Sequence, residues 1–157
     1  MLAADALNCV AKQPEILLRK KAPIIITPHP GEMSRLTGLA TPLVNAERQR
    51  VALDFAQKYG VVTVLKGAGT VIASPNGKVL VNPTGNSGMA TGGSGDVLAG
   101  MTASILAQGA SAFSSAAAAV YLHGLAGDIA AEKYGKISML PTDLINCIPL
   151  AYKRCGF

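Results

Sequence analysis

The segment with the clearest potential for chemistry is the glycine-rich stretch from Asn86 to Asp96, which leads directly into an apolar run. Five of the eleven residues from 85 to 95 are glycine. Because glycine has no Cβ, the backbone amides of such a turn can converge on one point. Where the turn enters a helix, unpaired N–H groups and the positive end of the helix dipole bind phosphate. We therefore expect a phosphate to be bound by Gly92, Gly93, Ser94 and Gly95.

Asp96 ends this turn and is its one side chain suited to proton transfer. A carboxylate beside a bound phosphate would accept a proton from a substrate hydroxyl. The alternative is that Asp96 only caps its helix, which is a common role for aspartate. The glycine density favours the catalytic interpretation. The segment is not a Walker loop, because no Gly-Lys-Ser/Thr follows, and it lacks the GxGxxG fingerprint of dinucleotide-binding folds.

A second candidate is the turn Lys-Gly-Ala-Gly-Thr at 66–70, which follows an apolar strand predicted over 61–65. Ligands of open α/β sheets bind at the carboxyl ends of the strands. A lysine there would contact a nucleotide phosphate or ribose, and a threonine would add a hydroxyl group. The pattern thus predicts a nucleotide site made of Lys66, Gly67, Ala68, Gly69 and Thr70. The alternative is a tight turn with no ligand.

A third candidate is the segment Thr-Pro-His-Pro-Gly-Glu at 27–32, also at the end of a predicted strand. Its two prolines restrict the backbone and would hold His29 and Glu32 in place. Glu32 is a candidate ligand of Mg²⁺, directly or through water, and His29 a candidate hydrogen-bond partner of a substrate. The alternatives are that Glu32 only compensates a helix dipole and that His29 is a surface turn residue.

The elements that must position these residues alternate between strands and helices. Strands are predicted at 23–27 and 61–65, with a hairpin at 71–81 whose turn is Asn76-Gly77. Helices are predicted at 32–37, 43–58 (with Thr41 as N-cap and Gly60 as stop), 96–108 and 112–133, and from 141 onwards. This order indicates an α/β layered fold with a mainly parallel sheet. With no repeat or linker in sight, residues 1–157 are expected to form one domain.

Composition narrows the function classes. Half of the 157 residues are apolar, and the 14 Lys and Arg exceed the 9 Asp and Glu by five. This modest positive charge is typical of a solvated, mildly basic surface or of one that attracts phosphate-bearing ligands. Nucleic acid is not expected, because no basic run carries interleaved aromatic residues. The three cysteines show no metal or disulfide spacing, so we expect the protein to lie in a reducing cytoplasm. The apolar stretch 112–131 is interrupted by His123 and Asp128, which predicts a buried helix rather than a membrane span.

Few other polar residues are candidates. Asp5 and Asn8 follow a short strand stub at 2–4 and would contact a ligand or simply cap the first helix. His123 is expected to be a satisfied core histidine, and we assign it no role. With so short a stub, the sheet is expected to keep an unpaired edge and exposed apolar surface.

Taken together, the segments resemble the ADP/ATP-dependent NAD(P)H-hydrate dehydratases, a branch of the ribokinase-like superfamily. TPHPGEMSRLTG (27–38) and GMATGGSGDVLAG (88–100) carry the specific resemblance. ADALN (4–8) and KGAGT (66–70) support it. The resemblance runs essentially from end to end of the chain, but the family's early strands before the DALN segment have no counterpart, so we expect an N-terminal part of the domain to be missing.

The resemblance implies an enzyme that restores hydrated NAD(P)H to NAD(P)H at the expense of ADP or ATP, with Mg²⁺. Asp96 would act as base on the ring hydroxyl, and Gly93 and Gly95 would form the anion hole. Turn 66–70 would line the nucleotide site, Glu32 would be linked to the metal, and substrate contacts would come from His29, Asn86 and Asp96. A homo-oligomer is also expected.

Two other functions stay open at this point. One is a small-alcohol kinase of the thiazole or hydroxymethylpyrimidine type, because these enzymes share the Gly-x-Gly-Asp anion hole; the wording TPHPGEM favours the dehydratase. The other is a chain that binds nucleotide without catalysis, because its N-terminal part is absent.

Overall fold

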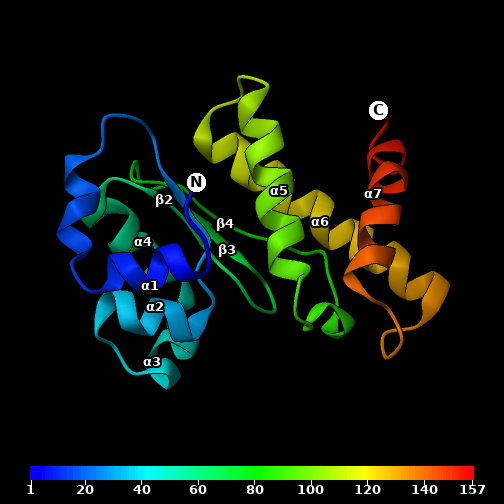
Figure 1. Ribbon diagram of the computed structural model, residues 1–157, viewed down its shortest axis with the longest axis horizontal. Coiled ribbons are helices and arrows are strands. Elements are labelled where there is room, and N and C mark those ends of the chain that lie inside the picture. The colour runs from blue at the N-terminus through cyan, green and yellow to red at the C-terminus, as the bar shows by residue number, and fades with distance from the viewer.

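The computed structural model describes all residues from 1 to 157 and is a layered α/β fold (Figure 1). Its helices are α1 (Asp5–Ala11), α2 (Pro30–Thr37), α3 (Thr41–Ala46), α4 (Arg48–Tyr59), α5 (Ser94–Ala107), α6 (Ala112–Tyr134) and α7 (Pro141–Arg154), with short 3-10 helices η1 (Pro14–Arg19) and η2 (Ser87–Met89). Its strands are β1 (Ile25–Ile26), β2 (Val62–Leu65), β3 (Val71–Ala73) and β4 (Val79–Val81).

The four strands form one sheet in the order β1-β2-β3-β4. The parallel pairing lies at one edge, where Ile25 is opposite Val62 and a single parallel bridge joins Leu2 to Ile26. β2, β3 and β4 pair in antiparallel fashion because short turns connect them. The Asn76-Gly77 hairpin is confirmed. The predicted α/β class is also confirmed, with the parallel part of the sheet confined to the β1 edge.

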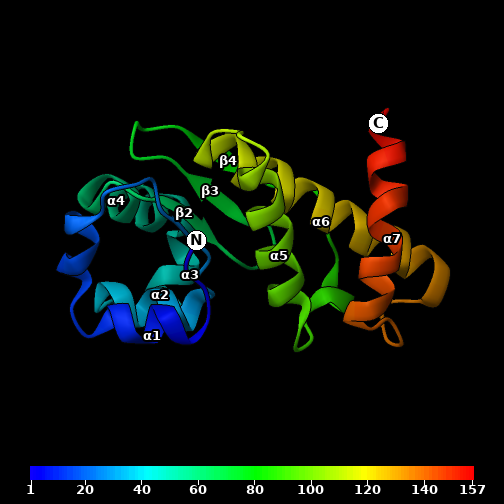
Figure 2. The ribbon, with the colours of Figure 1, turned by 45° about the horizontal axis from the view of Figure 1, so that its top comes forward.

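The two faces of the sheet carry separate hydrophobic clusters, and β2 shows how. Val62 and Val64 pack into the cluster shared with α5, α6 and α7, whereas Leu65 packs into the cluster shared with α1, η1, α2, α3 and α4. This alternation is the period of two that a strand imposes. Figures 1 and 2 show the two groups of helices on opposite sides of the sheet, which confirms the layered arrangement.

The prediction of one helix from Leu43 to Lys58 with Thr41 as N-cap is wrong. The N-cap is Ala40, and the helix is divided at Glu47, whose backbone (φ −123°, ψ 39°) is not helical. α3 therefore ends before α4 begins at Arg48. No proline or glycine marks this break, so helical periodicity carried the prediction across it. The predicted stop at Gly60 is confirmed by its left-handed φ of 65°.

The remaining helices lie close to their predicted ranges. α2 begins two residues earlier than expected, and Gly38 ends it. The interior of α6 is buried, as expected for 112–131, and no helix combines the length and apolar character needed to cross a membrane. The cysteines are free. On the edge strand β4, Leu80 and Val81 are about half exposed (47% and 49%), whereas Ile25 and Ile26 of β1, beside the stub, are fully buried.

Candidate phosphate-binding and catalytic site

The parallel pairing of β1 and β2 brings two predicted site residues together at the carboxyl ends of these strands. The backbone N–H of Lys66 donates to the carbonyl of Pro28 at 2.8 Å, which joins the two strand ends. Lys66 Nζ lies 3.8 Å from Glu32 Oε2, and the Glu32 side chain is buried. We call Glu32, Lys66 and the turn 66–70 the side-chain wall of the site.

His29 is the N-cap of α2 and not a free residue of a surface turn. Its Nδ1 accepts the backbone N–H groups of Gly31 (3.0 Å) and Glu32 (3.3 Å), and its own N–H donates to Glu32 Oε2 at 2.7 Å. This reciprocal capping box fixes the start of the helix. Because Nδ1 is an acceptor, the ring proton is on Nε2, and half of the side chain is exposed. His29 thus orients Glu32, and its Nε2 lies 3.6 Å from Glu32 Oε2; the substrate contact expected of His29 stays a prediction.

The glycine-rich turn supplies an opposite wall made of backbone. The N–H groups of Gly92, Gly93 and Gly95 donate to no carbonyl of the chain. Gly93, the N-cap of α5, has φ 96°, a conformation that side chains disfavour. We call residues 92–96 the amide wall. The walls meet, because a Cβ on Gly95 would lie only 3.4 Å from Lys66 Nζ.

Asp96 stands in the first turn of α5 with an exposed side chain that makes no hydrogen bond within the chain. It does not cap the helix: Gly93 occupies the N-cap position, and no side chain caps it. The capping alternative is therefore wrong. Asp96 is instead an unpaired carboxylate beside three unpaired amides, the geometry expected of a base next to an anion hole.

His123 of α6 contacts the amide wall through a hydrogen bond to Ser94. Its Nε2 lies 2.9 Å from the carbonyl oxygen of Ser94, the first residue of α5. Burial lowers the pKa of His123, the hydrogen bond to Ser94 raises it, and the charge of Lys66 lowers it. The imidazole is thus uncharged near neutral pH, and Nε2–H is the donor. His123 is a buried histidine with a hydrogen-bond partner, as expected. That partner, Ser94, belongs to the amide wall.

Asn86 precedes the amide wall in the glycine-rich segment and is the N-cap of η2. Its Oδ1 accepts the N–H of Gly88 at 3.0 Å, and its Nδ2 donates to the Gly127 carbonyl (3.0 Å) and to Asp128 (2.9 Å). Asp128 also accepts the N–H of Gly85 at 2.9 Å. These bonds tie the glycine-rich segment to α6. The substrate contact expected of Asn86 stays a prediction.

Asp5 and Asn8 lie at α1. Neither caps this helix, whose N-cap is Ala4 without a side-chain bond, so the capping alternative is wrong for both. Asn8 Oδ1 accepts from Arg35 Nε at 3.0 Å and thereby links α1 to α2.

The donor set suits Mg²⁺ carried by a nucleotide rather than held by a protein cage. No three His, Cys, Asp or Glu side chains cluster as a metal site. Glu32 offers Oε1, because Oε2 already accepts from His29. Mg²⁺ retains water and is commonly bound through one or two carboxylates together with substrate phosphates, and a lone Glu32 fits that mode.

Sequence reasoning missed three residues: His123 as a support of α5, Asp128 as a support of Asn86, and Arg48 of α4, whose Nη2 donates to the Leu65 carbonyl at 2.8 Å. The only signal for the first two was their polarity within an alanine-rich helix.

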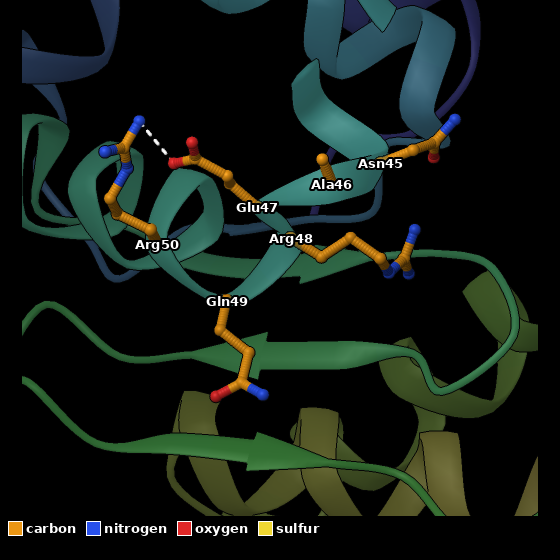
Figure 3. Close-up of a pocket in the computed structure, with 6 residues that line it drawn as sticks. All are labelled: Asn45, Ala46, Glu47, Arg48, Gln49 and Arg50. Carbon is orange, nitrogen blue, oxygen red and sulfur yellow. Dashed lines mark ion pairs between the residues drawn. The ribbon is translucent and has the colours of Figure 1, made fainter. Parts of the chain in front are cut away.

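A hollow of about 380 Å³ is lined by residues 45–50, and none of the predicted site residues lines it (Figure 3).

An α/β fold with unpaired amides at a helix start, an unpaired carboxylate and a lysine at strand ends is that of the ribokinase-like superfamily. A solved ribokinase-like superfamily protein from Enterococcus faecalis agrees: it is 32% identical, with TM-score 0.79 over 97% of this chain and 51% of the other. The chain belongs to the NAD(P)H-hydrate dehydratase family, whose model matches residues 1–150.

Two further relatives are similar over most of this chain. A bifunctional NAD(P)H-hydrate repair enzyme of Moorella thermoacetica is 47% identical over 151 residues, 96% of this chain and 28% of that protein. The crystal structure of the ADP/ATP-dependent NAD(P)H-hydrate dehydratase of Bacillus subtilis, co-crystallized with ATP/Mg²⁺, is 38% identical with TM-score 0.81, over 84% of this chain and 48% of that one. The chain thus spans half or less of the length of these relatives.

Proposed function

We propose that this chain carries out the ADP- or ATP-dependent dehydration of the S epimer of hydrated NAD(P)H, which returns the damaged cofactor to NAD(P)H. The observation that carries the proposal is the unpaired Asp96 carboxylate beside the unpaired amides of Gly92, Gly93 and Gly95. Family membership supplies the substrate class.

In the first step, the Asp96 carboxylate accepts the proton of the ring hydroxyl at C6, and the hydroxyl oxygen attacks the terminal phosphorus of the nucleotide. With ADP, the bond from that phosphorus to the bridging oxygen breaks and AMP leaves. The amide wall would hold the phosphoryl oxygens as negative charge develops on them. Positioning and charge stabilisation are the main requirements of such a transfer.

In the second step, the C6–O bond breaks and phosphate leaves, while a proton is lost from the adjacent ring carbon and the ring double bond is restored. Lys66 and turn 66–70 would bind the nucleotide throughout, and His29 and Asn86 would contact the hydrated ring. Mg²⁺ would neutralise charge on the nucleotide phosphates near Glu32.

The test is to incubate the chain with Mg²⁺, ADP and hydrated NADH. The proposal predicts equal amounts of AMP, free phosphate and NADH, with NADH followed by its absorbance. If a stable phosphorylated product accumulates without NADH, the chain is a small-alcohol kinase instead. Repeating the assay with ATP and with hydrated NADPH establishes which nucleotide and which cofactor the chain uses.

A second candidate is nucleotide binding without turnover. Calorimetry with ADP, taken together with the turnover assay on hydrated NADH, separates the candidates. Binding of ADP without NADH formation supports the second, whereas binding with turnover excludes it.

A further inference from the structure

Arg48 reaches the predicted nucleotide turn from a helix that carries none of the family motifs. It is the first residue of α4, directly after the helix break at Glu47. Its Nη2 donates to the carbonyl of Leu65, the last residue of β2, at 2.8 Å. Figure 3 shows its side chain extending along the end of this strand, away from the ion pair of Glu47 and Arg50. The next residue after Leu65 is Lys66.

The same guanidinium lies against Gly67. A Cβ at Gly67 would stand 2.9 Å from Arg48 Nη1 and 3.0 Å from Nη2. Gly67 also has φ 143°, which side chains rarely adopt. Arg48 therefore fills the space that a side chain at position 67 would take, and it contacts the turn on both sides of Lys66.

The placement of Arg48 carries a cost in stability. Arg48 is partly buried, burial lowers the pKa of its guanidinium, and its Nε is buried without an acceptor. A buried donor without a partner is destabilising. Arg50, two residues along, shows the ordinary arrangement: it is 63% exposed and pairs with Glu47.

We propose that Arg48 is a positioning residue that fixes turn 66–70 in the conformation that binds the phosphates of the nucleotide. The proposal rests on the proposed function, in which this turn binds ADP or ATP. By holding the Leu65 carbonyl and covering Gly67, Arg48 directs Lys66 towards Glu32 and Gly95. Without it, the turn would be anchored by the bonds from Lys66 to Pro28 and from Asn82 to Thr70.

The experiment measures ADP affinity by calorimetry in the presence of Mg²⁺, for the parent chain and the variants Arg48→Met, Arg48→Lys and Arg50→Met. Arg48→Met should weaken ADP binding about tenfold or more, the effect of one lost hydrogen bond from a charged group. Arg48→Lys should recover only part of the affinity, because it keeps the charge but loses the planar fork. Arg50→Met, which removes the same charge two residues away, should bind like the parent.

Each outcome is informative. If the parent does not bind ADP, the proposed function fails and not only the role of Arg48. If the parent binds and Arg48→Met binds equally well, the positioning role is wrong. Full recovery in Arg48→Lys would show that charge alone acts, which also contradicts it. Melting curves of all variants confirm that the comparison is made between folded chains.

Discussion

The side-chain wall and the amide wall face the same space but present different chemistry. At the ends of β1 and β2 the chain presents a buried carboxylate and a lysine 3.8 Å apart. At the start of α5 it presents unpaired backbone N–H groups and one unpaired carboxylate. Side chains at strand ends adapt to a ligand, whereas backbone amides at a helix start are fixed before it arrives. We infer that the first wall binds nucleotide and the second performs the transfer.

The supports of the walls differ as well. The side-chain wall is held by neighbours in the same half of the fold. The His29 N–H donates to Glu32, and Arg48 donates to the carbonyl of Leu65, which precedes Lys66. The amide wall is held from α6 through the bond of His123 to Ser94, and Asp128 of the same helix holds Asn86 in the segment that precedes the wall. Changes in the two sets should therefore affect different steps.

The largest effect is expected at Asp96. Asp96→Asn removes the base and keeps the shape, so turnover should fall by about 10²–10⁴, the usual contribution of a general base. NADH formation from hydrated NADH and ADP measures it. An unchanged rate would show that the amide wall acts without Asp96 as base.

A smaller effect is expected when the amide wall is distorted. Gly93→Ala places a Cβ at φ 96° and 3.1 Å from Pro141, so the turn must shift. Turnover should fall about tenfold to a hundredfold, because misplaced donors lose part of the stabilisation that an anion hole provides.

The matched control for Gly93→Ala is Gly100→Ala in the same helix. Nothing lies within 4 Å of a Cβ at position 100, and alanine favours a helix over glycine. This variant should keep full turnover. Equal losses in both variants would show that α5 as a whole, and not its first turn, is sensitive.

The smallest effect is expected at His123. His123→Leu removes the donor to the Ser94 carbonyl, and turnover should fall about tenfold, the equivalent of one hydrogen bond. KM for ADP should hardly change. His123→Gln retains an N–H donor and should recover much of the rate. If Leu and Gln behave alike, His123 contributes packing alone.

The features that could be predicted from the sequence are those that a short local pattern marks. Apolar runs marked the strands, Asn76-Gly77 marked the hairpin, and Gly38 and Gly60 marked helix ends. The glycine density around Asp96 located the amide wall. The break at Glu47 was missed because no proline or glycine marks it. The bonds from Arg48 to Leu65 and from His123 to Ser94 join residues 17 and 29 positions apart, and only the folded chain brings them together.

The division of labour between the walls is tested most directly by calorimetric titration of two variants with ADP and Mg²⁺, Lys66→Gln and Asp96→Asn. Lys66→Gln should bind ADP at least about tenfold more weakly, because a charged contact to phosphate is lost. Asp96→Asn should bind ADP as tightly as the parent or more tightly, because a carboxylate beside the phosphate is neutralised. Weakened binding in Asp96→Asn together with unchanged binding in Lys66→Gln would contradict the account.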